Sequence, residues 1–206
     1  MKIAINSLFL IDIYQTKNYL TMKKLLALPL IAFFALSQLS AQDPIFVKGD
    51  KVLNLGLGLG SALYTGSFYS MQIPPLSATL EVGLVDEIID KGSIGVGPYL
   101  GFASYKWEYS GWGYKYTNII IGGRGNFHYP FIDKLDTYTG LLIGFNIVSA
   151  SEFGNLVPGY DYSSASSGLE WSWFIGARYY FTEKIAGMVE LGYGIAYLNL
   201  GVAMRF

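Results

Sequence analysis

Hydrophobic residues occur at every second position along most of this chain. At its C-terminal end Leu198, Leu200, Val202, Met204 and Phe206 alternate with small or polar residues. Successive side chains of a β-strand point to opposite faces, so this period of two predicts a strand with one apolar face. The alternation recurs in eight segments: residues 53–60, 76–84, 94–102, 118–129, 138–147, 173–181, 188–195 and 198–206. The sequence therefore predicts an all-β chain of eight strands.

The face opposite the apolar one is unusual because much of it is glycine. In residues 53–60 four leucines alternate with Asn54 and three glycines. The solvated face of a soluble sheet would carry Lys, Glu, Thr or Ser instead, whereas glycine suits the crowded inside of a narrow barrel. The pattern has exceptions, since Ile120 and Leu142 fall on this inner face and two glycines, Gly123 and Gly125, fall on the apolar one.

Composition indicates where the apolar face goes. The 206 residues are 52% hydrophobic and only 14% charged, against about 25% charged in soluble domains. A sheet whose apolar face meets lipid must close, because an open edge would leave backbone groups without hydrogen-bond partners. We therefore predict an eight-stranded antiparallel transmembrane β-barrel, an up-and-down meander, over residues 51–206.

The predicted connections alternate in length, as they do in outer-membrane barrels, which have short periplasmic turns and longer outer loops. The short ones are Asp86–Gly92, Pro130–Leu135 and Thr182–Ile185, and the long ones are Ser61–Pro75, Tyr105–Tyr116 and Ser149–Gly168. The last hairpin, near Ile195–Tyr197, is short and breaks the alternation.

Residues 1–41 have the features of a cleaved signal peptide. Lys23 and Lys24 precede an apolar run of 12 residues, Leu25–Leu36, and small residues then lead to Ala41. We expect cleavage after Ala41, initiation at Met22 or at Met1 with a long leader, and a short periplasmic segment over residues 42–50. The alternative, a buried core helix, is disfavoured by the basic and small-residue flanks.

Charge and cysteine content exclude other classes. Residues 1–41 carry four Lys and one Asp, so 10 basic and 14 acidic residues remain after cleavage, a net charge of −4. Nucleic-acid binding requires a basic face and is not expected. The chain has no cysteine, which excludes disulfide-stapled domains, thiolate metal sites and thiol catalysis.

The inner face carries charged residues that we expect to fill the barrel. They are Glu81, Arg124, Arg178, Glu190 and Arg205, accompanied by Tyr99, Tyr138, Phe174 and Tyr180. We interpret this set as a packed core of ion pairs, and the alternative is an ion path lined by charges. Pairing Thr182 with Ala186 predicts that Arg178 and Glu190 lie opposite each other as an ion pair.

No catalytic, cofactor or metal site is predicted. His128 is the single histidine, and the predicted topology puts it two residues before a periplasmic turn, away from an outer-leaflet substrate. The glycines of Leu55–Gly60 alternate strictly and no helix follows them, so they do not form a dinucleotide-binding loop. We expect the chain not to be an enzyme.

Aromatic residues crowd the predicted long loops. Trp107, Tyr109, Trp112 and Tyr114 are candidate contacts for an extracellular ligand, since rigid aromatic rings lose little entropy on binding. The alternative is an aromatic girdle at the membrane interface together with packing of the loops on themselves.

With these features the chain resembles the small outer-membrane β-barrel proteins. This family includes the barrel of outer-membrane protein A and outer-membrane proteins X and W. The resemblance covers about residues 50–206. It rests mainly on the C-terminal strand ending in Phe206, and less on the opening of the mature chain, Lys48–Gly56, and on the segment Arg178–Glu183. It implies that Phe206 is a signal read by the outer-membrane assembly machinery.

Together these patterns predict an integral outer-membrane protein with a structural or surface-binding role. Its expected partners are outer-membrane lipid, the assembly machinery and an unidentified extracellular ligand. The alternative function is a porin-like channel for small solutes.

Overall fold

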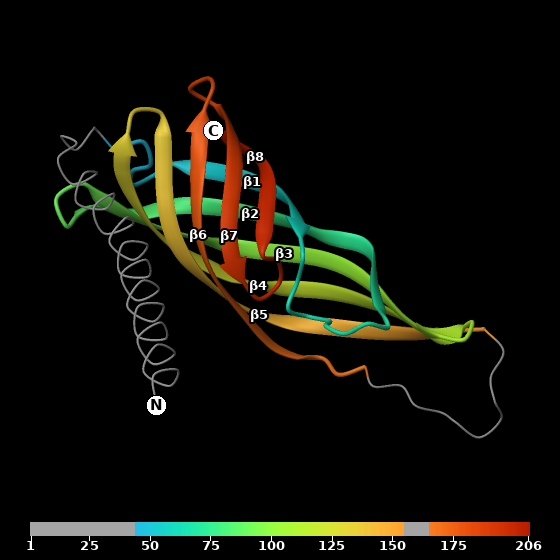
Figure 1. Cartoon of the computed structure of the whole chain (residues 1–206). Helices are drawn as coiled ribbons and strands as arrows, with labels where there is room; N and C mark the ends of the chain where they lie inside the picture. Colours follow the sequence, from blue (N-terminus) through green and yellow to red (C-terminus); the bar gives the residue numbers. More distant parts are fainter. Residues whose placement is uncertain (1–43, 155–164) are drawn as a thin grey trace, which may run out of the picture. The chain divides into compact units, whose positions relative to one another are not determined.

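The computed structural model describes residues 44–154 and 165–206, and eight strands in these ranges close into a single antiparallel barrel (Figure 1). The strands are β1 (Lys51–Leu59), β2 (Tyr69–Ile88), β3 (Gly92–Tyr109), β4 (Trp112–Ile132), β5 (Leu135–Phe153), β6 (Gly168–Tyr180), β7 (Ile185–Tyr193) and β8 (Leu198–Arg205). Each strand pairs with the next along the chain, and β1 pairs with β8. The predicted up-and-down barrel of eight strands is confirmed. The predicted signal peptide and its cleavage site lie outside the described residues.

The alternation of residues sets which side chains point into the barrel. On β5 Leu141, Ile143 and Phe145 are exposed on the outside, whereas Leu142 and Asn146 are buried inside. The exceptions in the pattern are also placed as their positions predict. Ile120 and Leu142 are fully buried in the lumen, and Gly123 and Gly125 lie on the outer surface.

Four neighbouring strands extend well beyond the others. β2 to β5 have 18–21 residues each, while β1, β7 and β8 have eight or nine. They run past the ends of the short strands as a curved sheet, which we call the sheet extension (Figure 1).

The predicted long loops are wrong in part, because strands of the sheet extension occupy much of them. Residues 105–116 form a hairpin, in which Tyr109 pairs with Trp112 across a two-residue turn at Ser110 and Gly111. Both turn residues have positive φ, as the tight turns of β-hairpins require. β2 and β5 likewise continue into the predicted loops Ser61–Pro75 and Ser149–Gly168. The prediction failed because it followed alternating aliphatic residues, which these segments lack, and residues 105–116 alternate aromatic with polar or small residues instead.

The short connections lie together at the opposite end of the barrel. They join β2 to β3, β4 to β5 and β6 to β7, and several of their residues, such as Ile89, Asp90 and Lys134, have positive φ. We call this the short-turn end. The opposite end, which carries the sheet extension and the short β7–β8 hairpin, is the long-loop end.

Two apolar clusters fill part of the lumen. The first is made of Tyr99, Ile120, Tyr138, Leu142, Phe174 and Ile195. The second lies at the short-turn end and is made of Phe46, Val52, Tyr180, Ala186 and Ala203. The guanidinium group of Arg178 is 4.9 Å from the ring of Tyr138 and 5.3 Å from the ring of Phe46. A charged layer therefore separates the two clusters.

Candidate functional site

The charged residues predicted to face inward lie inside the barrel. Glu81, Arg124, Arg178 and Glu190 are almost completely buried, and Arg205 is partly buried at the short-turn end. They belong to different strands and meet only because the barrel is closed.

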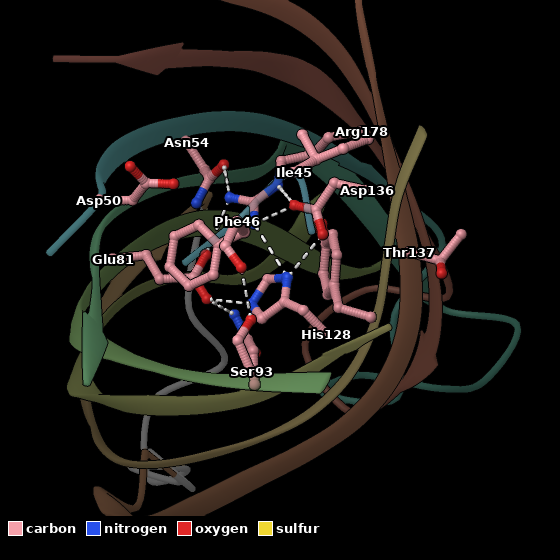
Figure 2. Close-up of polar contacts among 12 residues, drawn as sticks. Ile45, Phe46, Asp50, Asn54, Glu81, Ser93, His128, Asp136, Thr137 and Arg178 are labelled. Atoms are coloured by element: carbon pink, nitrogen blue, oxygen red, sulfur yellow. Dashed lines mark hydrogen bonds and ion pairs between the residues drawn. The ribbon is translucent and has the colours of Figure 1, made fainter. Parts of the chain in front are cut away.

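Arg178 on β6 is the centre of the larger cluster (Figure 2). Its Nη1 donates to Oε2 of Glu81 at 2.9 Å, and its Nε donates to Oδ2 of Asp136 at 2.8 Å. Nη1 also donates to the Asn54 side chain at 3.2 Å. Arg178 thus neutralises carboxylates from β2 and β5, which flank the lumen on different sides.

His128 completes this cluster. Its Nδ1 is 2.8 Å from Oδ1 of Asp136, and its Nε2 is 2.7 Å from Oε1 of Glu81 (Figure 2). Oε1 of Glu81 also accepts from the amide of Asn126 at 2.8 Å. Both carboxylates therefore contact Arg178 and His128 at once.

The second cluster holds Arg124 and Glu190. Nη2 of Arg124 donates to Oε1 of Glu190 at 2.6 Å. Tyr138 donates to the same oxygen at 2.8 Å, and Asn199 donates to Oε2 at 2.9 Å. The guanidinium carbon of Arg124 lies 3.9 Å from the centre of the Phe174 ring.

The predicted ion pair between Arg178 and Glu190 is wrong. Arg178 pairs across the strands with Met188, and Glu190 pairs with Gly176. The register differs by two residues from the assumed one, because Tyr180 and not Thr182 lies opposite Ala186. The turn closes with Phe181 donating to the carbonyl of Ile185 at 3.0 Å, and the hydroxyl of Thr182 accepts from the backbone N–H of Ile185 at 3.0 Å. A shift of two residues keeps both side chains facing inward but gives them other partners.

Sequence reasoning gave no role to several members of the network, among them Asp136, Asn54 and His128. Asp136 directly follows the predicted turn Pro130–Leu135 and was not assigned to a strand face, although its even number matches the inward residues of β5. Asn54 and His128 were placed inward but given no role. The signal that would have found Asp136 is charge balance, since the five predicted charges comprise two acids and three bases and so lack one acid.

The lumen contains a small cavity near the second cluster. This cavity of about 40 Å³ lies beside Arg124 and Glu190 and is lined also by Tyr99, Ser77, Asn199 and Ile195. This volume accommodates a few water molecules. At the long-loop end the β1–β2 connection folds over the barrel, with Leu63 packed on the first apolar cluster. Tyr64 donates to Asn118 at 3.4 Å, and burial raises the pKa of this tyrosine.

The predicted loop contacts lie together in the sheet extension. Trp107 and Trp112 pack edge to face, with ring centroids 5.6 Å apart, and Trp112 packs on Tyr114 at 5.5 Å. Nε1 of Trp112 donates to Glu152 at 2.7 Å. Tyr114 is only 5% exposed, whereas Tyr109 is 57% exposed and contacts Phe68, which is 54% exposed.

These rings are part of one aromatic cluster that continues into the barrel mouth. We define it as Tyr64, Phe68, Tyr69, Tyr105, Trp107, Tyr109, Trp112, Tyr114 and Tyr116. Most of its members are packed against one another, and its outer end, at Phe68 and Tyr109, is open to solvent. The cluster stiffens the extension and exposes apolar surface at its outer end.

Within residues 44–154 and 165–206, no three His, Cys, Asp or Glu side chains are grouped so as to hold a metal ion. Over the same ranges no helix is long and apolar enough to cross a membrane. The arrangement of His128 leaves neither ring nitrogen available as a general base, since each already faces a carboxylate.

No protein-family model matches the chain, and no curated protein matches it. Among solved structures, the chain is similar to Ail, the attachment invasion locus protein of Yersinia pestis. The two share 13% sequence identity with a TM-score of 0.42, over 77% of this chain and 96% of Ail. The fold assignment rests on the strand pairing of the chain itself.

Proposed function

We propose that this chain is an integral outer-membrane barrel protein with a structural role, and that it presents the outer end of the sheet extension to a partner at the cell surface. The observation that carries the proposal is a closed barrel whose outer face is apolar all the way round. Aromatic flanks of the apolar band support the membrane location, and the lengths of the connections support the orientation.

The outer face is suited to lipid and not to water. Leucine, isoleucine, valine and aromatic side chains on all eight strands are exposed there, including Leu57, Leu100, Ile143 and Leu191. A monomeric soluble protein rarely exposes an apolar patch larger than a few hundred Å². In a bilayer the same residues face hydrocarbon, and barrel closure satisfies the backbone groups.

Aromatic residues flank this apolar band at both ends. Tyr179 and Phe181 pack at 5.5 Å at the short-turn end, and Trp171 and Tyr193 pack at 6.3 Å at the other. On β6 the eight residue steps from Trp171 to Tyr179 span about 26 Å along the strand, at roughly 3.3 Å per step. A tilt of about 40° reduces this to about 20 Å across the membrane, close to the apolar band of outer-membrane barrels.

The orientation follows from the lengths of the connections. The short-turn end faces the periplasm together with both ends of the mature chain, and the sheet extension projects outside. Residues 1–41 serve as the export signal in this proposal. The packing of the lumen argues against the alternative of a porin-like channel, since ion pairs, aromatic rings and the folded-in β1–β2 connection fill the space that a solute would need.

The contact surface is narrower than the four residues predicted from the sequence. Tyr114 is buried, and Trp107 and Trp112 are held by edge-to-face packing, so these three form the support. Phe68 and Tyr109 are the rings that a partner would touch.

Cysteine labelling tests the membrane location and the orientation together, because the chain has no native cysteine. Ser110→Cys in the hairpin turn should react with a membrane-impermeant maleimide on intact cells. Glu183→Cys in the β6–β7 turn is the matched control and should react only after the outer membrane is permeabilised. Labelling of both sites in a soluble fraction would disprove the membrane location, and the reversed pattern would disprove the orientation.

A further inference from the structure

The N-terminal residues of the described chain turn back into the barrel. Phe46 is 1% exposed, and its ring stacks on His128 with centroids 4.3 Å apart (Figure 2). The hydroxyl of Ser93 on β3 donates to the carbonyl of Phe46 at 2.7 Å. Phe46 therefore covers the charged cluster from the short-turn end. We call residues 44–50 the plug.

Two glycines make room for the plug. A Cβ at Gly95 would lie 2.8 Å from the Phe46 ring, and a Cβ at Gly83 would collide with the backbone of Val47. The absence of a side chain at Gly83 also permits two backbone hydrogen bonds, from Gly49 to Gly83 and from Gly83 to Asp50, both 2.9 Å. The position of the plug is thus fixed by backbone hydrogen bonds and by the space above two glycines, as well as by the packing of the Phe46 ring.

The plug also joins the first strand to the last. Arg205 on β8 donates to the carbonyl of Ile45, and the same guanidinium is 3.7 Å from the carboxylate of Asp50. Next to it, the backbone N–H of Val47 donates to Asp50 at 3.0 Å. The two contacts of Arg205 therefore tie the plug to the last strand as well as to the first.

Hydrogen-bond geometry determines the charge of the histidine beneath the plug. Both ring nitrogens of His128 lie within 2.8 Å of a carboxylate oxygen. A neutral imidazole has one N–H and one lone pair, so one of these contacts would set a lone pair against a carboxylate. Nη2 of Arg178 also lies 3.3 Å from Nδ1, but the carboxylate contact to the same nitrogen is shorter. The two short carboxylate contacts therefore favour an imidazolium that donates from both nitrogens.

Charge balance in the lumen agrees with this assignment. Glu81, Asp136 and Glu190 supply three negative charges, and Arg124 and Arg178 supply two positive charges, so His128 supplies the third. Titratable, charged and polar groups face the histidine or its partners from every strand. They are Asn54 on β1, Glu81 on β2, Ser93 on β3, Arg124 and Asn126 on β4, Asp136 and Tyr138 on β5, Arg178 and Tyr180 on β6, Glu190 on β7, and Arg205 on β8 with Asp50 beside it. Loss of one proton from His128 leaves an uncompensated negative charge in a site shielded from water, which is costly.

We propose that residues 44–50 are a pH-sensitive plug, seated on doubly protonated His128 and released when that residue loses a proton. Release removes Phe46 from the charged cluster and admits water from the short-turn end to solvate the unbalanced carboxylate. The opposite end stays closed, because Leu63 and the first apolar cluster do not depend on this proton. The device therefore exposes a charged chamber on one side of the barrel without opening a pore.

The plug can be followed by cysteine reactivity in the full-length chain. Ile45→Cys, which is partly covered by the second apolar cluster, reports on release, and Glu183→Cys on an exposed turn corrects for the intrinsic effect of pH on the thiol. One linked proton changes an equilibrium by up to about tenfold per pH unit. The ratio of the two labelling rates should be low near neutral pH and rise towards that slope in alkaline buffer.

Three variants of the Ile45→Cys protein separate the contributions of His128, Phe46 and Ser93 to the closure of the plug. His128→Gln lacks the titrating group, so its ratio should be high and independent of pH. Phe46→Ala should raise the ratio at neutral pH. Ser93→Ala removes the bond to the Phe46 carbonyl but leaves the charged cluster intact, so it should raise the ratio and keep its pH dependence.

Spectroscopy of the unsubstituted chain gives an independent readout that does not need His128→Gln to fold. The ring of His128, the single histidine, should show two protonated nitrogens at neutral pH in ¹⁵N spectra. A single ring N–H at neutral pH, or a labelling ratio that does not change with pH in the Ile45→Cys protein, would overturn the proposal.

Discussion

At the scale of single residues, the lumen is organised by which cation meets which carboxylate. Arg178 contacts Glu81 and Asp136, and Arg124 contacts Glu190. The parity of residue numbers predicts that these side chains face inward, because a strand has a period of two. It does not predict partners. A partner depends on the length of each turn and on contacts across the lumen between strands that are not neighbours.

A double-mutant cycle distinguishes the observed pairs from the one that simple hairpin counting suggests. Arg124→Met and Glu190→Gln should show a coupling energy above about 1 kcal/mol, because each leaves a buried group without its partner. Arg178→Met and Glu190→Gln should be nearly additive. Urea unfolding in lipid vesicles, followed by tryptophan fluorescence, measures both cycles. Equal coupling in the two cycles would contradict the partners described above.

At the scale of elements, the sheet extension shows what an aliphatic pattern does not detect. Inside the membrane the outward residues must be apolar, so the strands are visible in the sequence as leucine, isoleucine and valine at every second position. Beyond the membrane that requirement ends, and residues 105–116 alternate aromatic and polar side chains in a hairpin. The eight strands and their faces follow from the sequence, whereas the true lengths of β2 to β5 depend on contacts among aromatic rings.

Gly113 is the residue at which the extension is most sensitive to an added methyl group. A Cβ there would collide with the backbone carbonyl of Trp107 on the paired strand. Gly113→Ala should therefore loosen the hairpin and raise the rate of trypsin cleavage at Lys106 and Lys115, while the barrel stays folded. Gly125→Ala is the control, since a Cβ there meets nothing within 4 Å. Equal cleavage of the two variants would show that close strand packing at Gly113 is unimportant.

The C-terminal residue, Phe206, takes part in closing the barrel through its backbone but not through its ring. The backbone N–H of Phe206 donates to Lys51 at 3.0 Å, while its ring is 71% exposed. An exposed ring contributes little to folding, so Phe206→Ala should leave the unfolding free energy of the assembled barrel within about 0.5 kcal/mol of the original. If the ring is an assembly signal, the same change should lower the amount of protein in the outer membrane at native expression. Unchanged membrane levels would remove that role.

At the scale of the whole molecule, closure makes the barrel one cooperative unit. No strand of the ring has a free edge over the length shared with its neighbours, so unfolding cannot begin by peeling one strand away. The lumen is closed by Leu63 and Tyr64 at one end and by Phe46 at the other. Both properties follow from the same ring of strands, and they lead to two measurements on the purified protein.

The protein should be heat-modifiable and should not conduct ions. In mild detergent an unheated sample should migrate differently from a boiled one, because the closed barrel stays compact until heat unfolds it. In planar bilayers at neutral pH it should give no steady open level, since ion pairs and aromatic rings fill the lumen and the cavity beside Arg124 and Glu190, of about 40 Å³, holds only a few waters. Phe46→Ala should remain silent as well, because the first apolar cluster still blocks the other end. A stable conductance in the unsubstituted protein would restore the channel function, and identical migration with and without heating would contradict the barrel.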